Sequence, residues 1–294
     1  MKVALIQQKY HHSKADTIAV TVELIDKASS CGAELIVLQE LHQNEYFCQS
    51  EDTRFFEYAV SFEDDIKFWS NIAKVNSIVL VTSLFEQRAA GLYHNTVVAF
   101  EKDGSIAGKY RKMHIPDDPG FYEKFYFTPG DMGFEPIDTS VGRLGVLVCW
   151  DQWYPEAARI MALKGAEVLI YPTAIGWFDE DNDDEKKRQL DSWVTIQKSH
   201  AIANGIPVLS CNRVGFEPDD SGVMKGIRFW GNSFVCGAQG EMMTEADNKN
   251  ENILYADINH NRSKEVRDIW PFLRDRRIED YKCLLKRYCD NNVQ

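Results

Sequence analysis

The stretch GVLVCWD at residues 145–151 decides how the rest of the chain is interpreted. Its apolar run predicts a buried strand, which we place over Gly142–Trp150, and Pro155 favours the start of a helix shortly afterwards. This strand runs into the Cys149 thiol and the Asp151 carboxylate. Because open α/β sheets place their ligands beyond the carboxyl ends of strands, Cys149 is a candidate functional residue.

Two other apolar runs end in the same way, one at Glu40 and the other at Lys112. A glutamate, a lysine and a cysteine that converge would supply a base, a cation and a nucleophile. The nucleophile needs such neighbours, because a thiol with a pKa of about 8.5 is mostly protonated at neutral pH. A lone cysteine on a strand is usually an inert buried thiol, so the prediction depends on all three motifs.

Short apolar strands alternate with amphipathic helical patterns along the whole chain. Besides the strand that leads to Cys149, we predict strands at 3–6, 35–38, 78–81, 93–101, 106–110, 168–171, 208–210, 228–236 and 253–258. Helices are predicted at 14–31, 63–76, 155–163 and 186–204. This alternation predicts a layered α/β fold, and a hairpin turn at 102–105 indicates mixed sheets. Because no linker divides the chain, we expect a single domain over 1–294.

The composition excludes several classes of function. The chain has 294 residues, of which 44% are apolar, as is typical of folded globular proteins. Its formal net charge of −12 disfavours nucleic acid and favours a cationic or neutral small molecule. No apolar run approaches the roughly 20 residues that cross a bilayer, and the N-terminus becomes polar too early for a signal peptide. We therefore expect a cytoplasmic protein that does not contact membranes.

The seven cysteines indicate neither disulfides nor a metal site. Their number is odd, they are spread over the chain, and they form no Cys-x-x-Cys pair or zinc-type spacing. Reduced thiols in the cytosol are the simplest interpretation. The expected cofactors are therefore none, metal included.

An acidic segment at 179–185 holds six carboxylates in seven residues. We interpret it as a loop before a helix. Such runs are most often solvated faces, but this one follows a predicted strand end and has aromatic residues around it. Carboxylates and aromatic rings are the groups that bind an ammonium ligand. The candidate substrate-binding residues are Tyr46, Trp153, Tyr154, Trp177, Asp179 and Glu180.

Together these motifs resemble the nitrilase (carbon–nitrogen hydrolase) superfamily over nearly the whole chain. The segments that carry the resemblance are LQE at 38–40, GKYRKMH at 108–114, GVLVCWD at 145–151 and YPE at 154–156. The resemblance implies a four-layer α-β-β-α sandwich. It also implies hydrolysis of nitriles, amides or N-carbamoyl groups through a cysteine, without a metal or organic cofactor.

The resemblance also implies roles for individual residues. Cys149 would be the nucleophile and Glu40 the general base that takes its proton. Lys112 and the backbone N–H of Trp150 would stabilise the oxyanion of the tetrahedral intermediate. Glu123 matches a second glutamate that many members carry, and it would help to hold the attacking water.

Within the superfamily, the chain most resembles N-carbamoylputrescine amidases, on residues 115–131, 171–177 and 270–277. This implies hydrolysis of N-carbamoylputrescine to putrescine, carbon dioxide and ammonia, in a route from arginine to polyamines. One rival is β-ureidopropionase, whose carboxylate substrate Arg213 or Arg228 would bind. Another is an ω-amidase or nitrilase. A remote alternative is a catalytically silent scaffold protein.

The resemblance further implies a homo-oligomer, a dimer or larger. The C-terminal extension, residues 259–294, carries Arg274, Arg276 and Arg277 beside Trp270-Pro271-Phe272. This density of charge next to apolar side chains leads us to expect that the extension packs against a neighbouring subunit.

Overall fold

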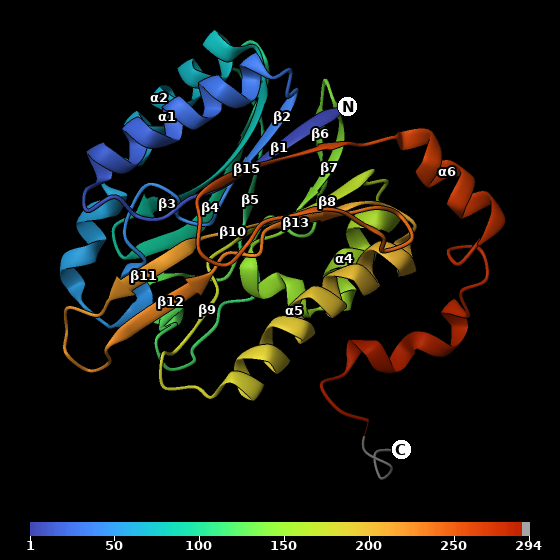
Figure 1. Ribbon diagram of the computed structural model, residues 1–294. Helices are drawn as coiled ribbons and strands as arrows, with labels where there is room; N and C mark the ends of the chain where they lie inside the picture. The colour runs from blue at the N-terminus through green and yellow to red at the C-terminus, as the bar shows by residue number, and fades with distance from the viewer. Residues whose placement is uncertain (290–294) are drawn as a thin grey trace.

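Two six-stranded sheets stack face to face at the centre of the computed structural model, which describes residues 1–289 (Figure 1). The first sheet has the order β15 (Asn252–Asp257), β1 (Lys2–Gln7), β2 (Leu35–Leu38), β3 (Val79–Ala89), β4 (Leu92–Phe100), β5 (Ile106–Arg111). β1, β2 and β3 pair in parallel, whereas β15, β4 and β5 join antiparallel. The sheet is therefore mixed, as the hairpin turn predicts.

The second sheet is also mixed. Its order is β14 (Met242–Glu245), β13 (Phe234–Cys236), β10 (Val208–Asn212), β8 (Val168–Thr173), β7 (Gly142–Val146), β6 (Ile137–Thr139). A small third sheet contains β11 (Val214–Pro218), β12 (Gly226–Trp230) and β9 (Gly176–Trp177). It lies beside the ends of β8 and β10 (Figure 1).

Helices cover the outer face of each large sheet. α1 (Lys14–Ser30) and α2 (Phe62–Asn76) lie against the first sheet. α4 (Pro155–Leu163) and α5 (Asp183–Asn204) lie against the second. The prediction of a four-layer α-β-β-α sandwich is confirmed.

The alternation of side chains along a strand explains the two cores. In β1, Val3 and Leu5 belong to the core between the two sheets, whereas Ala4 and Ile6 pack with α1 and α2. Since both faces of the central strands are buried, their sequences read as continuous apolar runs. Each buried aliphatic side chain contributes roughly 1.5–3 kcal/mol to folding.

Three sequence predictions of local structure are wrong. The strand predicted over Gly142–Trp150 ends at Val146, because the chain turns sharply before Cys149. The single strand predicted at 228–236 is two strands in different sheets, which are separated by positive φ angles at Gly231 and Asn232.

The acidic segment is the third. It is a loop only as far as Asn182, whose side chain accepts a 2.9 Å hydrogen bond from the backbone N–H of Glu185 and so caps α5. Residues 183–185 form the first turn of that helix. Acidic side chains are favoured there by the positive end of the helix dipole.

The chain leaves the sandwich after β15. α6 (His260–Ile269) is followed by the 3₁₀ helix η4 (Ile278–Leu285), in which no residue is buried. Figure 1 shows this red segment beside the body of the molecule. The last five residues of the predicted extension, 290–294, lie outside the described residues. Over residues 1–289, no helix has the length and apolarity that crossing a bilayer requires.

Candidate active site

The chain makes a strained turn at Cys149. β7 ends at Val146, and residues Cys149–Trp153 form the short 3₁₀ helix η3. Cys149 itself has a φ of +42°, in the left-handed region that side chains other than glycine rarely adopt. Such a conformation costs on the order of 1–3 kcal/mol and persists only where the surroundings hold it in place.

Asp151 supplies much of that support. Its buried carboxylate accepts hydrogen bonds from the backbone N–H of Val148 at 2.9 Å and from the hydroxyl of Tyr110 at 2.8 Å. It also accepts one from the backbone N–H of His114 at 3.0 Å, and its Oδ1 lies 2.7 Å from the His114 ring. One carboxylate therefore ties the turn at Cys149 to the segment that carries Lys112.

Three charged side chains form a fully buried cluster, which we call the buried charged cluster: Glu40, Lys112 and Glu123. The Nζ atom of Lys112 donates to Oε1 of Glu40 at 2.8 Å and to Oε2 of Glu123 at 2.6 Å. Glu40 Oε1 also accepts from Asn95 at 2.7 Å, and Glu123 Oε1 accepts from the Tyr46 hydroxyl at 2.7 Å. Each charge is thus paired and hydrogen-bonded, as burial requires.

Glu40 follows β2, Lys112 follows β5 and Glu123 begins the short helix α3 (Glu123–Tyr126). The first two therefore come from strand ends of the first sheet, while Cys149 follows a strand of the second. The face-to-face packing of the sheets brings these segments together.

The charges of the cluster act on one another. Burial works against a charged lysine, but Glu123 and Glu40 outweigh it and hold the pKa of Lys112 well above its usual value. Burial raises the pKa of Glu123 to about 7, although Lys112 opposes this shift. Burial, together with the charge of Glu40, raises the pKa of the Cys149 thiol well above its usual value. The resting thiol is therefore protonated and needs a base at the moment of reaction.

Glu40 has one carboxylate oxygen that is free to accept the thiol proton. Its Oε2 atom is buried and has no hydrogen-bond partner among residues 1–289. The Cys149 thiol itself donates only a long contact of 3.9 Å to the backbone oxygen of Ala174. A thiol, a carboxylate with a free oxygen and a fixed cation can together form a covalent intermediate and stabilise an oxyanion.

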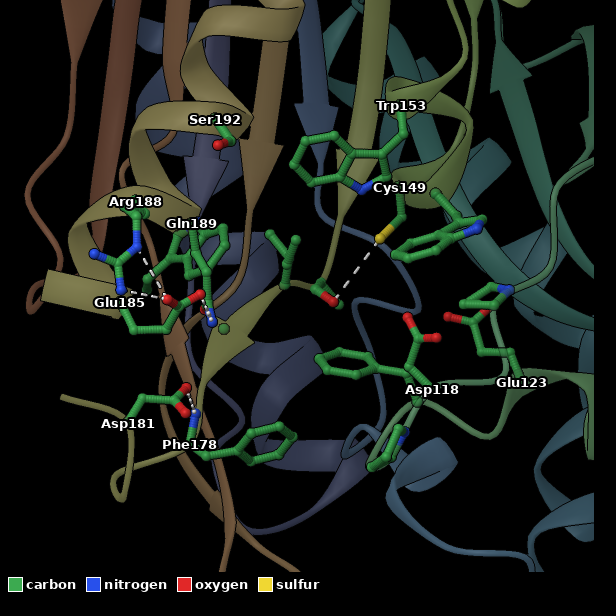
Figure 2. A pocket seen from close by; sticks show the side chains of 18 residues that line it. Asp118, Glu123, Cys149, Trp153, Phe178, Asp181, Glu185, Arg188, Gln189 and Ser192 are labelled. Atoms are coloured by element: carbon green, nitrogen blue, oxygen red, sulfur yellow. Dashed lines mark hydrogen bonds and ion pairs between the residues drawn. The ribbon is translucent and has the colours of Figure 1, made fainter.

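A cavity of about 530 Å³ opens onto Cys149. Its lining includes five aromatic side chains, those of Phe121, Trp150, Trp153, Phe178 and Trp230. Its charged lining residues are Asp118, Glu123, Asp181, Glu185 and Arg188. Figure 2 shows Cys149, Glu123 and the Asp118 carboxylate on one side of the cavity, and Asp181, Glu185 and Arg188 on the other.

The predicted aromatic substrate-binding residues fall into two groups. Trp153 lines the cavity, as does the predicted oxyanion residue Trp150. Tyr46 is buried behind the cavity, where it bonds to Glu123. Tyr154 stacks on the His114 ring with centroids 3.7 Å apart, and Trp177 donates its indole N–H to the backbone oxygen of Lys186. The last two do not belong to the cavity lining.

The structure does not place the predicted acidic residues, Asp179 and Glu180, in the cavity lining. Asp179 forms a two-point ion pair with Arg228 at 2.7 and 2.9 Å, and Glu180 pairs with Lys225 at 2.7 Å. Neither carboxylate lines the cavity, because cations from β12 and its preceding loop hold them outside. The acidic residues that do line it are Asp118, Glu123, Asp181 and Glu185.

Sequence reasoning missed Asp118 and Arg188. Asp118 stands in the segment 115–131 that carries the resemblance, next to Pro119 and Gly120, which was the available signal. No sequence pattern pointed to Arg188, because it lines the cavity only as a result of where α5 packs. It pairs with Glu185 at 2.7 Å on the cavity wall.

Arg213 and Arg228 do not line the cavity as the β-ureidopropionase alternative requires. Arg228 is held by Asp179, as described above. Arg213 is fully buried and donates to Glu217 and to backbone oxygens of residues 40–44. Within residues 1–289, no group of three or more His, Cys, Asp and Glu side chains has the arrangement of a metal site.

Comparison with known proteins gives a consistent result. The family model of the carbon–nitrogen hydrolases matches residues 2–268. The chain is 39% identical to a citrullinase from Francisella tularensis, over 98% of this chain and 99% of the relative. It is 41% identical to an N-carbamoylputrescine amidase from Arabidopsis thaliana, over 91% of this chain and 89% of the relative.

Solved structures agree with this picture. A carbon–nitrogen hydrolase from Helicobacter pylori G27 superposes with a TM-score of 0.97 at 60% identity, over 98% of this chain and 99% of that one. The deeply buried Glu–Lys–Glu arrangement beside Cys149, the sandwich fold and these matches lead to one conclusion. The chain belongs to the carbon–nitrogen hydrolases, the nitrilase superfamily, and is an amidohydrolase of that family.

Proposed function

We propose that this enzyme hydrolyses N-carbamoylputrescine to putrescine, carbon dioxide and ammonia. The observation that carries the proposal is the cavity that opens onto Cys149, whose lining combines five aromatic side chains with the carboxylates of Asp118, Glu123, Asp181 and Glu185. N-Carbamoylputrescine has a ureido group at one end and an ammonium at the other. The ureido group needs a reactive thiol, and the ammonium needs a binding site of carboxylates and aromatic rings. Identities of 39–41% to plant N-carbamoylputrescine amidases support the same substrate.

The chemistry follows from the buried side chains. Oε2 of Glu40 takes the thiol proton as Cys149 Sγ attacks the ureido carbon, and the carbonyl oxygen becomes an oxyanion. Lys112 and the backbone N–H of Trp150 stabilise this charge. The C–N bond to putrescine then breaks, and Glu40 returns the proton to the leaving amine. Cys149 is left carrying a carbamoyl thioester.

Water completes the cycle. Glu40 takes a proton from water, which attacks the carbamoyl carbon, while Glu123 helps to hold it. The C–S bond breaks, the proton returns to the thiolate, and the released carbamate decomposes to carbon dioxide and ammonia. Every step uses side chains of this protein and water alone.

The distal ammonium is bound by cavity carboxylates other than Glu123, chiefly those of Asp118 and Asp181. The Asp118 carboxylate has no hydrogen bond or ion pair among residues 1–289, and it points into the cavity in Figure 2. Asp181 accepts only a 3.3 Å bond from the backbone N–H of Phe178. The aromatic ring of Phe178 adds a surface that attracts a cation.

A second substrate is favoured by a specific observation. Citrulline carries the same ureido group, but its far end holds a carboxylate beside the ammonium. Arg188 on the cavity wall is a cation that would bind this carboxylate after leaving Glu185. The 39% identity to the Francisella citrullinase supports this alternative.

A substrate panel separates the candidates. Ammonia release is measured from N-carbamoylputrescine, citrulline and N-carbamoyl-β-alanine, with Cys149→Ser as the blank. We expect N-carbamoylputrescine to have the highest kcat/KM. A higher kcat/KM for citrulline, lost in Arg188→Gln, would transfer the assignment to that substrate. Preference for N-carbamoyl-β-alanine would refute both.

We also propose that the enzyme acts in the cytoplasm, in polyamine synthesis. All seven cysteines are free in the described chain, and a reducing compartment keeps thiols in this state. Cys149 must stay reduced to act as a nucleophile, so the chemistry and the location agree.

Assembly into a homo-oligomer through the C-terminal extension is a further part of the proposal. Residues 270–289 contain six basic and three acidic side chains, while the whole chain has a net charge of −12. Exposed apolar side chains share this segment, and they include Phe272, Ile278, Leu284 and Leu285. A cationic, apolar segment is complementary to the acidic body of a second copy.

Arg159 on α4 supports the same assembly, because its buried Nη1 atom has no partner in the part of the chain that the structure describes. A second copy would supply the acceptor. Sedimentation velocity at micromolar concentration tests the idea. We expect an oligomer that dissociates in the double variant Leu284→Asp, Leu285→Asp, and a monomeric wild type would refute it.

A further inference from the structure

The segment from Glu40 to Tyr46 carries two side chains of the site but belongs to no helix or strand. It leaves the end of β2, and Leu41 has a φ of +46°, in the left-handed region. The peptide groups in this segment therefore lack the ladder of hydrogen bonds that fixes a strand. Something else must hold Glu40 against Lys112 and orient its free oxygen.

The buried guanidinium of Arg213 holds this segment. Its Nη2 donates to the backbone oxygens of Leu41 at 2.9 Å and Glu40 at 3.3 Å. Both of its terminal nitrogens donate to the backbone oxygen of Asn44 at 3.0 Å. The side chain is completely shielded from solvent. Three successive points of the segment are thus fixed by one planar group.

Glu217 on β11 completes the arrangement. Its Oε1 accepts from Arg213 Nη1 at 2.6 Å, and its Oε2 accepts from the backbone N–H of Tyr46 at 2.7 Å. Tyr46 in turn donates its hydroxyl to Glu123. The contacts close into a ring that runs from Arg213 through Glu217, Tyr46, Glu123 and Lys112 to Glu40, and back to Arg213 through the Glu40 carbonyl.

The hydrogen bonds around Arg213 also extend to the strand end beside Cys149. The backbone oxygen of Thr173, at the end of β8, accepts from the backbone N–H groups of both Glu40 and Arg213. The next residue, Ala174, accepts the thiol contact of Cys149. The backbone of Arg213 is therefore hydrogen-bonded to the strand end whose next residue contacts the reacting sulfur.

We propose that the Arg213–Glu217 ion pair is a positioning device that holds Glu40 and Tyr46 in the geometry for proton transfer from Cys149. It rests on the proposed function for the roles of Glu40 and Cys149, but it is independent of which ureido compound is the substrate. Neither residue lines the cavity, so they act through the side chains that they hold.

The chemistry of arginine explains why this residue stands there. A guanidinium presents several N–H donors in one plane, and Arg213 uses them on three carbonyl oxygens and one carboxylate. Lysine keeps the charge for Glu217 but has a single nitrogen and cannot reach all of these acceptors. Arg213→Lys therefore releases the segment while it retains the buried ion pair.

The test compares Arg213→Lys and Glu217→Gln with Arg267→Lys as a matched control. Arg267 is only partly buried, but it too donates to a backbone oxygen, that of Asn204 at 2.9 Å, at the far end of α5. We expect kcat for ammonia release to fall about 10- to 100-fold in both test variants, with KM within threefold of wild type. In Arg267→Lys only the melting temperature should fall.

A second readout does not depend on the substrate. The rate at which iodoacetamide alkylates Cys149 is followed by mass spectrometry of the peptide that contains it, since Cys31, Cys283 and Cys289 are exposed and react too. We expect this rate to fall in parallel with kcat, because Glu40 no longer takes the thiol proton efficiently. If the wild type hydrolyses none of the ureido compounds, the substrate proposal fails, while alkylation still tests the positioning role.

The outcomes are distinct. A folded Arg213→Lys enzyme with kcat and alkylation rate within twofold of wild type would overturn the proposal and leave the ion pair a purely structural role. If Arg213→Lys does not fold, Glu217→Gln decides, because it keeps the size of the side chain and an acceptor for Tyr46. Unchanged kcat and alkylation in that variant would equally overturn the proposal.

Discussion

In the buried charged cluster, Lys112 lies between two carboxylates that are shielded from water, whereas in the acidic segment the carboxylates of Asp179 and Glu180 pair with exposed cations. Both places contain the same kinds of ion pair at similar distances. Burial makes the difference, because each charge in the cluster depends on its partners, while water screens the exposed pairs. A run of acidic residues in the sequence is therefore weaker evidence for a functional site than a single carboxylate that follows a buried apolar strand.

Removal of the buried cation should have the largest effect. In Lys112→Met, Glu40 and Glu123 face each other without a counter-charge, and we expect unfolding in urea to show a loss of about 3–5 kcal/mol. Activity of the folded fraction should fall at least about 100- to 1000-fold, because an oxyanion donor is lost. Lys225→Met, which leaves the exposed Glu180 unpaired, is the matched control and should change neither quantity.

The next test concerns pH. Because burial raises the pKa of Glu123 from 4.5 to about 7, the folded protein binds a proton there over a range in which the unfolded chain does not. Stability from this group is therefore present below pH 4.5 and is lost as the pH rises towards 7. The free energy of unfolding, measured for wild type and Glu123→Gln between these values, should decline more steeply with pH in wild type. Parallel curves would contradict the shift.

A smaller effect is expected at the cavity wall. In Asp118→Asn, we expect KM for N-carbamoylputrescine to rise about tenfold with kcat unchanged, since one charged contact to the ammonium is lost. N-Butylurea, which lacks the ammonium, serves as the control compound and should show the same KM in both proteins. An equal rise for the two compounds would mean that Asp118 shapes the cavity and does not bind the ammonium.

The smallest effect is predicted outside the cavity. Asp179→Asn breaks the two-point pair with Arg228 but leaves the cavity lining intact. We expect kcat/KM for N-carbamoylputrescine to stay within twofold of wild type. A tenfold loss would show that the acidic segment binds substrate after all, as the sequence suggested.

The sequence alone indicated the residues that the folded chain brings together at the candidate site, for a physical reason. Glu40, Lys112 and Cys149 each follow an apolar strand, and strands that are buried on both faces are readily recognised. The second glutamate, Glu123, was found only through its resemblance to the family. The layers of the fold follow from the same strands and the amphipathic helices between them.

The remaining features depend on contacts between distant parts of the chain. Asp179 and Glu180 form ion pairs with Arg228 and Lys225, which approach from 45 residues or more away in sequence, and they do not line the cavity. The division of the strand predicted at 228–236 depends on the positive φ at Asn232, which no apolar pattern reveals. Nothing in the sequence indicates a partner for Arg213. Only the folded chain shows that its guanidinium binds the backbone of the segment from Glu40 to Asn44.

The central claim is that Cys149 takes the carbamoyl group and that putrescine leaves before the group is hydrolysed. Rapid mixing of the enzyme with N-carbamoylputrescine, followed by acid quenching, measures putrescine and ammonia within the first turnover. We predict that putrescine appears first, that ammonia follows after a lag, and that Cys149→Ser produces neither. Ammonia that appears ahead of putrescine, or turnover in Cys149→Ser, would contradict the claim.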